Sequence, residues 1–423
     1  MKPSTFEYYF NLLYSLYSFP NIVLPFFAGI LVTIFGNRIM FIVYGACIVL
    51  GQFITSIGSS RLSMNTMLVG RIVFGLGGES LNVCQTSMIV KWFFKSSSAL
   101  PLGLGITISR LGSVLNDVIS PRFAKESNAS PAFWGGLIMC IISFMAITII
   151  FIVDYEKDHA INDGNSDTNI ADSDIVKVNC CQLFSDVKHL NTLFWILTFL
   201  CLTTYGSVMP FNYIATGFFT ATTLKDMPSI EARKMAGIYM GVPFFIGAIM
   251  VPIVGALIDK FGNRTILALL SGAMCLITFV FFYLMQPLFP LILLGISYSI
   301  FAAVIWPSIA ISVNDKEKVG LAYGTTTSIQ SLGLAINPLI VASLLVGFGS
   351  YQFCLLFFTF LGFISMLFGL WLLYENQYNR NSLLDKVKFD DEEEKKDFKP
   401  LPQNPNYNTF SEEKIEDETH LKV

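Results

Sequence analysis

Long uninterrupted apolar segments recur along this chain, and they constrain its fold more than any other feature. A helix needs about 20 consecutive apolar residues to cross a bilayer, and the sequence offers eleven segments that meet this need. They lie at residues 8–35, 39–60, 66–90, 99–122, 133–153, 191–216, 235–258, 265–285, 288–312, 320–347 and 351–374. Charged residues make up only 13% of the chain, about half of the roughly 25% found in soluble domains. We therefore expect an all-α polytopic membrane protein.

An internal repeat divides these segments into two groups. Residues 29–38 read GILVTIFGNR and residues 255–264 read GALIDKFGNR, with six identities in ten positions at an offset of 226. Duplicated helical halves joined by a polar linker are typical of transporter folds. We predict four regions, which are an N-terminal bundle at 1–153, a polar linker at 154–190, a C-terminal bundle at 191–374 and a disordered cytosolic tail at 375–423.

The same offset gives the two halves unequal numbers of helices. Five segments fall in the first half and six in the second, and the counterpart of the segment at 191–216 would lie before Met1. The first helix of a twelve-helix plan is therefore expected to be missing. Two interpretations stay open, because either the reading frame starts at an internal methionine or the protein has eleven spans.

The repeated segments carry a loop motif that points to a structural or gating role. In the second copy the motif residues are Gly255, Asp259, Gly262 and Arg264. They resemble the loop motif of the major facilitator superfamily, which connects the second and third helices of each half. The first copy keeps Gly29, Gly36 and Arg38 but has Thr33 in place of the acidic residue. Arg71 belongs to a second string, Arg71-x-x-x-Gly75-x-Gly77, that resembles a signature of the fourth helix of the same family.

Charges inside membrane spans are the strongest candidates for a functional site. Each costs at least about 2.5 kcal/mol at the bilayer centre, and all four lie in the first half, at Arg71, Glu79, Arg110 and Asp117. Glu79 and Arg110 are expected near the midplane on consecutive antiparallel helices. They either form a salt bridge between helices or flank a cavity, where Glu79 would bind an ammonium group and Arg110 a carboxylate. The second arrangement predicts a zwitterionic ligand. Asp117 is open to a second reading as an acid near a helix end.

The spans of the second half contain no charged residue, so their candidates are polar and aromatic. A few convergent polar groups among aromatic rings suit a ligand site. On this ground we predict that the opposite wall of the cavity includes Tyr205, Tyr298, Trp306, Gln330 and Asn337. Packing or interfacial anchoring is the alternative role for each of them.

Several strings together resemble the lysosomal dipeptide transporters of the major facilitator superfamily. The most specific is Gly77-Gly78-Glu79-Ser80 within 70–80, and further strings lie at 17–24, 109–113, 294–299, 306–307, 322–324 and 328–336. The resemblance extends from about residue 10 to 374. It implies a carrier of dipeptides that leave the lumen, bound through their terminal charges by Glu79 and Arg110. It also implies a heavily glycosylated single-span partner protein. We expect no cofactor, and no nucleic-acid partner because the sequence has no basic stripe or domain.

The sequence contains no catalytic motif of an enzyme. We expect a carrier that works by alternating access as a uniporter. Two other functions remain open: a degenerate carrier that acts as a receptor or partner subunit, and a carrier of sugars or organic anions. A lysosomal or endosomal membrane is expected, with the plasma membrane as the alternative. The strings Asn404-Pro405-Asn406-Tyr407 and Tyr407-Asn408-Thr409-Phe410 resemble endocytic sorting signals, and Ser382-Leu383-Leu384 resembles an incomplete dileucine signal.

Overall fold

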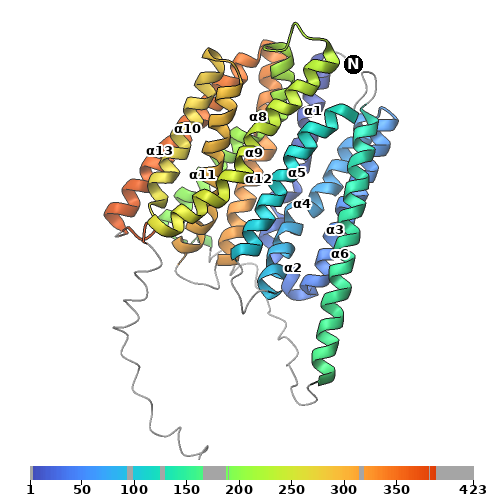
Figure 1. Ribbon diagram of the computed structural model, residues 1–423, viewed down its shortest axis with the longest axis vertical. Helices are drawn as coiled ribbons and strands as arrows, with labels where there is room; N and C mark the ends of the chain where they lie inside the picture. Colours follow the sequence, from blue (N-terminus) through green and yellow to red (C-terminus); the bar gives the residue numbers. More distant parts are fainter. Residues whose placement is uncertain are drawn as a thin grey trace, which may run out of the picture.

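The computed structural model describes residues 3–92, 99–123, 129–164, 187–188, 190–313, 319–380 and 382–386. Within these ranges the chain is helical and contains no strand, and the helices form two bundles that lie side by side (Figure 1). The first bundle consists of α1 (Pro3–Ser18), η1 (Pro20–Ile22), α2 (Leu24–Phe35), α3 (Asn37–Ser60), α4 (Met64–Trp92), α5 (Ala99–Phe123) and α6 (Ser130–Gly164). The second consists of α8 (Thr192–Ala221), α9 (Ser229–Phe261), α10 (Arg264–Leu284), α11 (Leu288–Ser312), α12 (Val319–Phe348) and α13 (Tyr351–Asn379).

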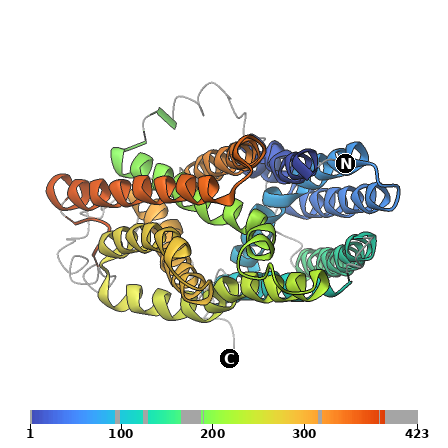
Figure 2. The ribbon, with the colours of Figure 1, turned by 90° about the horizontal axis from the view of Figure 1, so that it is seen from above.

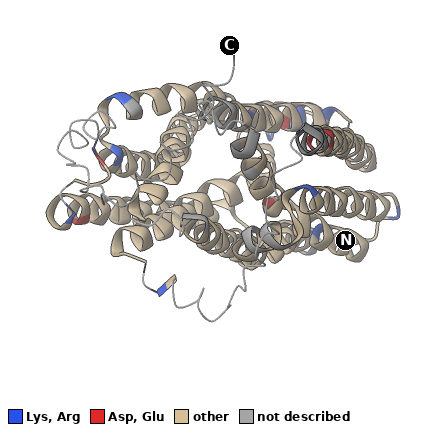
Figure 3. Ribbon diagram, turned by 90° about the horizontal axis from the view of Figure 1, so that it is seen from below, with Lys and Arg blue, Asp and Glu red and all other residues tan. Residues whose placement is uncertain are grey.

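Nine of the described helices are long and apolar enough to cross a membrane, namely α3, α4, α6 and α8–α13. The other two predicted segments are α5, which carries several polar residues, and the broken pair α1 and α2. Figure 3 shows how few described Lys, Arg, Asp and Glu residues interrupt the bundles. The chain is therefore a multi-pass membrane protein, and among the described residues three of the nine candidate spans lie in the first bundle and six in the second.

The first predicted span, 8–35, is interrupted, whereas the sequence predicted one continuous segment. Pro20 has no backbone N–H to donate, so the α-helical ladder ends at Ser18 and continues as a short 3₁₀ turn before α2. The side chain of Asn21 donates to the carbonyl of Tyr17 at 3.2 Å, which satisfies one acceptor at the end of α1. The break lies beside α4 and α12.

Two helices continue past their predicted ends. Helix α6 runs to Gly164, well beyond the predicted start of the linker at residue 154, and α13 runs to Asn379. Residues 382–386 then form a turn against the second bundle, within the range predicted as a disordered tail. Apolar content marks the membrane-spanning part of a helix, and polar residues can extend that helix into water. The sorting strings at 404–410 lie outside the described residues.

The two bundles meet along three pairs of helices. Helix α5 packs along α9, and both α1 and α2 pack along α12. Seen from above, the first and second bundles occupy opposite sides of the molecule, with these pairs between them (Figure 2). The α5–α9 contact is close, since a Cβ atom at Gly237 would lie 2.9 Å from Cγ of Pro121.

Most of the apolar core belongs to the second bundle. Its central helix, α8, has the largest buried share of any of the nine candidate spans, at 72%. Phe211 on α8 contacts the rings of Phe218, Phe279, Phe282 and Phe358 in edge-on and tilted geometries. The described core of the first bundle is much smaller and centres on Phe41 and Tyr44.

The repeated loop motif turns the chain and ties helices together within each bundle. Gly36 and Gly262 have φ values of +83° and +67°, a backbone conformation that favours glycine, so the chain turns at a glycine in each copy of the motif. Arg38 forms an ion pair with Asp154 on α6, and Arg264 donates to the carbonyl of Leu384 at 2.9 Å. Close helix approach is not the role of Gly255, because a Cβ atom there would meet nothing within 4 Å. The structure does not describe the surroundings of Gly29 or the side chain of Asp259.

Candidate functional site

Glu79 lies on α4 beside the broken first span. The hydroxyl of Tyr17, at the end of α1, donates a hydrogen bond to its carboxylate. Glycine makes this contact possible, because a Cβ atom at Gly78 would lie 2.6 Å from the Tyr17 hydroxyl. The local string Gly77-Gly78-Glu79 therefore allows a tyrosine from another helix to reach a membrane-buried acid.

Arg110 lies on α5 and reaches into the second bundle. Its Nη1 donates to the hydroxyl of Tyr298 on α11 at 2.6 Å, and its Cζ lies 4.3 Å from the centre of the same ring. Tyr205 on α8 also bonds to the guanidinium and packs edge-on against Tyr298, with ring centroids 5.6 Å apart. Trp306 bonds to the hydroxyl of Tyr205. The structure thus brings four of the predicted site residues into one connected group.

Glu79 and Arg110, both within the described residues, do not pair with each other. No ion pair joins them within 4.0 Å, and each charge is instead satisfied by tyrosine. A salt bridge between helices, which the sequence left open, is therefore absent from this structure. Two opposite charges that are held apart can bind the two ends of one ligand.

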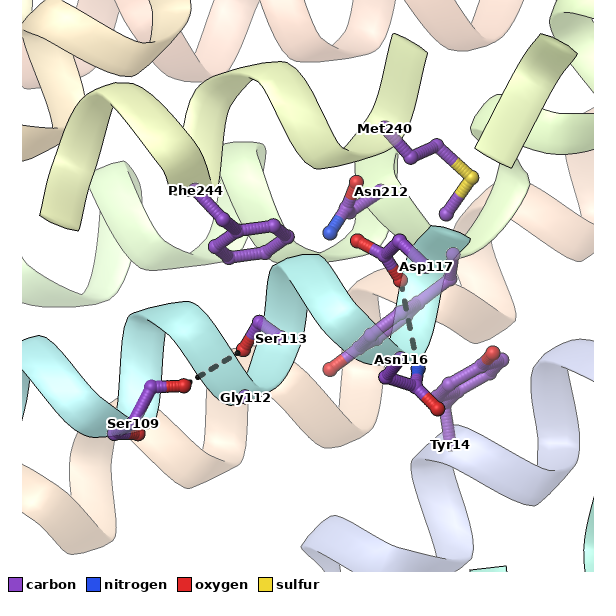
Figure 4. A pocket seen from close by; sticks show the side chains of 10 residues that line it. Tyr14, Ser109, Gly112, Ser113, Asn116, Asp117, Asn212, Met240 and Phe244 are labelled. Atoms are coloured by element: carbon purple, nitrogen blue, oxygen red, sulfur yellow. Dashed lines mark hydrogen bonds between the residues drawn. The ribbon is translucent and has the colours of Figure 1, made fainter. Parts of the chain in front are cut away.

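A cavity of about 450 Å³ lies between the two bundles. Its walls come from α1, α5, α8 and α9. The lining residues are Tyr14, Ser109, Gly112, Ser113, Asn116, Asp117, Asn212, Tyr213, Met240 and Phe244 (Figure 4). Its volume falls in the range of about 300–1,000 Å³ that is usual for small-molecule sites.

Asp117 supplies the cavity with a carboxylate whose bonding capacity is only partly used. Its Oδ1 accepts from Asn116 at 3.5 Å, and its buried Oδ2 has no hydrogen-bond partner. The side chain of Asn212 extends from α8 toward the same space (Figure 4). Helical spacing puts Asp117 two turns from Arg110. This end of the cavity can accept hydrogen bonds from a ligand.

Tyr213 lies in the wall of the cavity and interacts with residues of both bundles. Its ring stacks on that of Tyr14 at 3.8 Å and 9°, which joins α8 to α1 across the bundles. It also lies within electrostatic range of Glu79 and Tyr298. Neither the acid nor the arginine lines the cavity, which shares Tyr213 with the surroundings of Glu79 and Tyr298.

The other predicted residues occupy different places. Gln330 accepts from the thiol of Cys201, and Asn337 donates to the carbonyl of Gly206 at 2.8 Å, so both tie α12 to α8 inside the second bundle. Arg71 lies over the ring of Phe74 on its own helix, at 5.6 Å. These contacts are structural ones.

Sequence reasoning missed most of the cavity lining. One signal was available, because polar residues recur along α5 with helical spacing, at Ser109, Ser113, Asn116, Asp117 and Ser120. Such a polar stripe on a membrane helix indicates a face turned away from lipid. Tyr14, Asn212 and Tyr213 carried no such signal. Among the described residues no group of three or more His, Cys, Asp or Glu could hold a metal ion.

Comparison with known proteins places the chain in a family. The sequence model of the Major Facilitator Superfamily matches residues 5–338 and 232–409. The chain is 31% identical over 371 residues to the Lysosomal dipeptide transporter MFSD1 of Bos taurus, covering 85% of this chain and 75% of that protein. The protein of the same name from Danio rerio is 30% identical over 349 residues, covering 79% and 72%.

Solved structures share the fold at low sequence identity. The crystal structure of nucleoside transporter NupG superposes with a TM-score of 0.60 at 10% identity, covering 87% of this chain and 90% of that one. The human organic anion transporter MFSD10 (TETRAN) gives a TM-score of 0.58 at 14% identity, covering 85% and 83%. The sequence matches and the structural matches agree with what the chain shows, which is two bundles, a duplicated loop motif and a cavity between the bundles. The chain belongs to the major facilitator superfamily of membrane transporters.

Proposed function

We propose that this protein moves dipeptides, or similarly small zwitterions, across a lysosomal or related membrane by alternating access. The observation that carries the proposal is the separation of Glu79 and Arg110. Each charge is held by a tyrosine from another helix, and the two do not neutralise one another. Glu79 would receive the terminal ammonium group and Arg110 the terminal carboxylate. The similarity to lysosomal dipeptide transporters supports the substrate class and the membrane.

Arg110 suits the role of carboxylate ligand because tyrosines orient it. A guanidinium offers a planar pair of donors that matches a carboxylate, and the contacts to Tyr298 and Tyr205 fix its direction. A guanidinium has five N–H donors, and the two hydroxyls that bond to it leave donors for a carboxylate. We assign Tyr205 and Tyr298 to the positioning of Arg110, and Trp306 to the positioning of Tyr205.

The mode of transport we propose is uniport. Rocking of the two bundles about the α5–α9 and α1–α12 contacts would expose the cavity to each side in turn. Glu79 and Arg110 carry opposite charges, which the two ends of a zwitterion can satisfy without a coupled ion. Uptake that proceeds without any ion gradient, and without accompanying proton flux, is the expected behaviour of the reconstituted protein.

Uptake of labelled dialanine into proteoliposomes tests the substrate class directly. Transport should be inhibited by unlabelled dipeptides, and much less by the same peptides with an acetylated amine or an amidated carboxylate. Inhibition by sugars or by organic anions in place of dipeptides would assign the protein to the alternative carrier class. No uptake of any of these, from protein that is folded and correctly inserted, would favour the receptor or partner-subunit function.

The cavity itself disfavours an anion carrier. Asp117 presents a carboxylate with an unused oxygen to the space between the bundles, and like charges repel in a medium of low dielectric constant. The family resemblance adds a partner to the proposal, a heavily glycosylated single-span protein. Co-purification from native membranes, identified by mass spectrometry, tests that part separately from transport.

A further inference from the structure

The segment that follows α13 folds back onto the second bundle. Residues 382–386 form a turn in which the amide of Asp385 donates to the carbonyl of Ser382 at 3.0 Å. The side chain of Leu384 is completely buried, and Leu383 packs against the apolar core of the same bundle. The turn is thus packed like part of a domain, although it lies outside the last apolar span.

Asn376, near the end of α13, holds this turn from one side. The residue is fully buried and uses three of its groups. Its backbone carbonyl accepts from the amide of Ser382 at 2.9 Å, and its Oδ1 accepts from the amide of Leu384 at 3.0 Å. Its Nδ2 donates to Oδ2 of Asp385 at 2.8 Å. An asparagine that satisfies both donor and acceptor capacity in this way fixes the turn in one orientation.

The start of α10 holds the turn from the other side. Asp385 accepts from the backbone amide of Thr265 at 2.9 Å and from its hydroxyl at 2.6 Å. It therefore caps a helix that begins 120 residues earlier in the chain. The local residue at this position, Asn263, is left-handed with a φ of 53° and makes no capping bond through its side chain. The acidic side chain also opposes the positive end of the helix dipole.

Arg264 completes the attachment. This loop-motif residue is only 5% exposed, and its Nη1 donates to the carbonyls of Leu384 and Lys386 at 2.9 and 3.3 Å. In the first bundle the repeat counterpart of Arg264 is Arg38, which pairs with the carboxylate of Asp154 on α6. In the first bundle the motif arginine thus ties the start of α3 to α6, and in the second it ties the start of α10 to the turn that follows α13.

We propose that residues 382–386 are a structural clamp joining the start of α10 to the end of α13, and that Leu383-Leu384 is its apolar anchor. This assignment replaces the interpretation of Ser382-Leu383-Leu384 as a dileucine sorting signal. An adaptor protein binds such a signal by taking the leucines into pockets of its own, and Leu384 is already enclosed by the core. Both attachment points belong to one bundle, so a rocking motion between the bundles leaves the clamp closed.

Thermal unfolding of the purified full-length protein tests the clamp. Leu384→Ala removes the anchor and should lower the Tm by about 5 °C or more. Lys386→Ala is the matched control within the turn, because the side chain of Lys386 is exposed and only its carbonyl is used. Asp385→Ala should also lower the Tm, since it removes the cap of α10. An unchanged Tm in both the Leu384→Ala and Asp385→Ala variants would overturn the proposal.

Cysteine accessibility keeps the test independent of unfolding. In membranes opened on both sides, a Leu384→Cys variant should react with a water-soluble maleimide at least about 10-fold more slowly than a Lys386→Cys variant, after subtraction of the parent's labelling. Equal rates would show that the turn is not docked. The claim that Leu383-Leu384 is not a sorting signal is tested separately. If it is correct, Leu383→Ala leaves the protein in the same membrane. Redistribution of that variant to the plasma membrane at unchanged Tm would show that the pair is a signal after all.

Discussion

The guanidinium of Arg110 on α5 binds both the hydroxyl and the ring face of Tyr298 on α11, and so joins the two bundles at the site. The contact couples a charge of the first bundle to an aromatic wall in the second. A ligand carboxylate that binds Arg110 would therefore contact a residue that is already linked to both bundles. Substrate binding at Arg110 would therefore act directly on a contact between the two bundles.

Tyr298→Phe tests that coupling with the smallest possible change. The ring and its cation–π contact stay, while the hydrogen bond to a charged group is lost, which is worth roughly 1.5–3 kcal/mol. We expect the KM for dialanine to rise about 10-fold. Tyr283→Phe on α10 is the control, because that hydroxyl bonds to the carbonyl of Gln352 away from the cavity. Equal kinetics of the two variants would argue against a role for Tyr298 in positioning Arg110.

Glu79→Gln tests the ammonium site. The change preserves shape but removes the negative charge, so uptake of a dipeptide with a free amine should fall at least about 10-fold. The N-acetylated peptide has no ammonium group, and its weak inhibition should be the same for parent and variant. Glu231→Gln, at the exposed start of α9, controls for charge alone. If the variant lost free and acetylated peptides in equal proportion, Glu79 would not be the amine ligand.

The sequence predicted the spans well because their requirement is local and simple. A helix that crosses a bilayer must be apolar over about 20 residues, so α3, α8, α10 and α11 fall within a few residues of their predicted ranges. The break at Pro20 could be predicted only weakly, since proline is tolerated inside membrane helices, and five other described helices contain one without ending.

Long-range partners were beyond sequence reasoning for a different reason. Glu79 and Arg110 were recognisable as rare intramembrane charges, but their partners, Tyr17 and Tyr298, come from ordinary aromatic positions on other helices. Asp385 likewise sits in a short charged segment beside Lys386 and Lys388, where nothing local distinguishes a helix cap from a solvated charge. Which polar residues converge depends on helix rotation and packing, and a single sequence does not contain that information.

Gly78→Ala tests the close approach of α1 to α4. The added methyl group would lie 2.6 Å from the Tyr17 hydroxyl, so the tyrosine must move and its bond to Glu79 must lengthen. We expect an increase of about 10-fold in KM, corresponding to one charge-assisted hydrogen bond. Gly255→Ala is the matched control on α9, where a Cβ atom meets nothing within 4 Å. That variant should keep its kinetics and be stabilised by up to about 1 kcal/mol.

Arg38→Ala tests the brace of the first bundle. The side chain of Asp154 is fully buried, and removal of its partner leaves a buried charge, which costs about 3 kcal/mol. The Tm of the purified protein should therefore fall by several degrees. The double variant Arg38→Met with Asp154→Leu should recover part of the loss, because apolar residues can replace a buried ion pair. A double variant less stable than Arg38→Ala would contradict the assignment of the pair as a brace.

Asp117→Asn tests whether the cavity selects its ligand by charge. The substitution keeps the size of the side chain and its contact with Asn116, but it removes the negative charge beside the unpartnered Oδ2. Acidic dipeptides should then inhibit dialanine uptake by the variant more strongly than uptake by the parent. Their inhibition constant should fall about 10-fold if one repulsive interaction of about 1.4 kcal/mol is relieved. Inhibition by uncharged dipeptides should change much less, which makes them the internal control. A uniform loss of affinity for both classes would instead assign Asp117 to the packing of α5 against α9, where its backbone carbonyl faces Gly237.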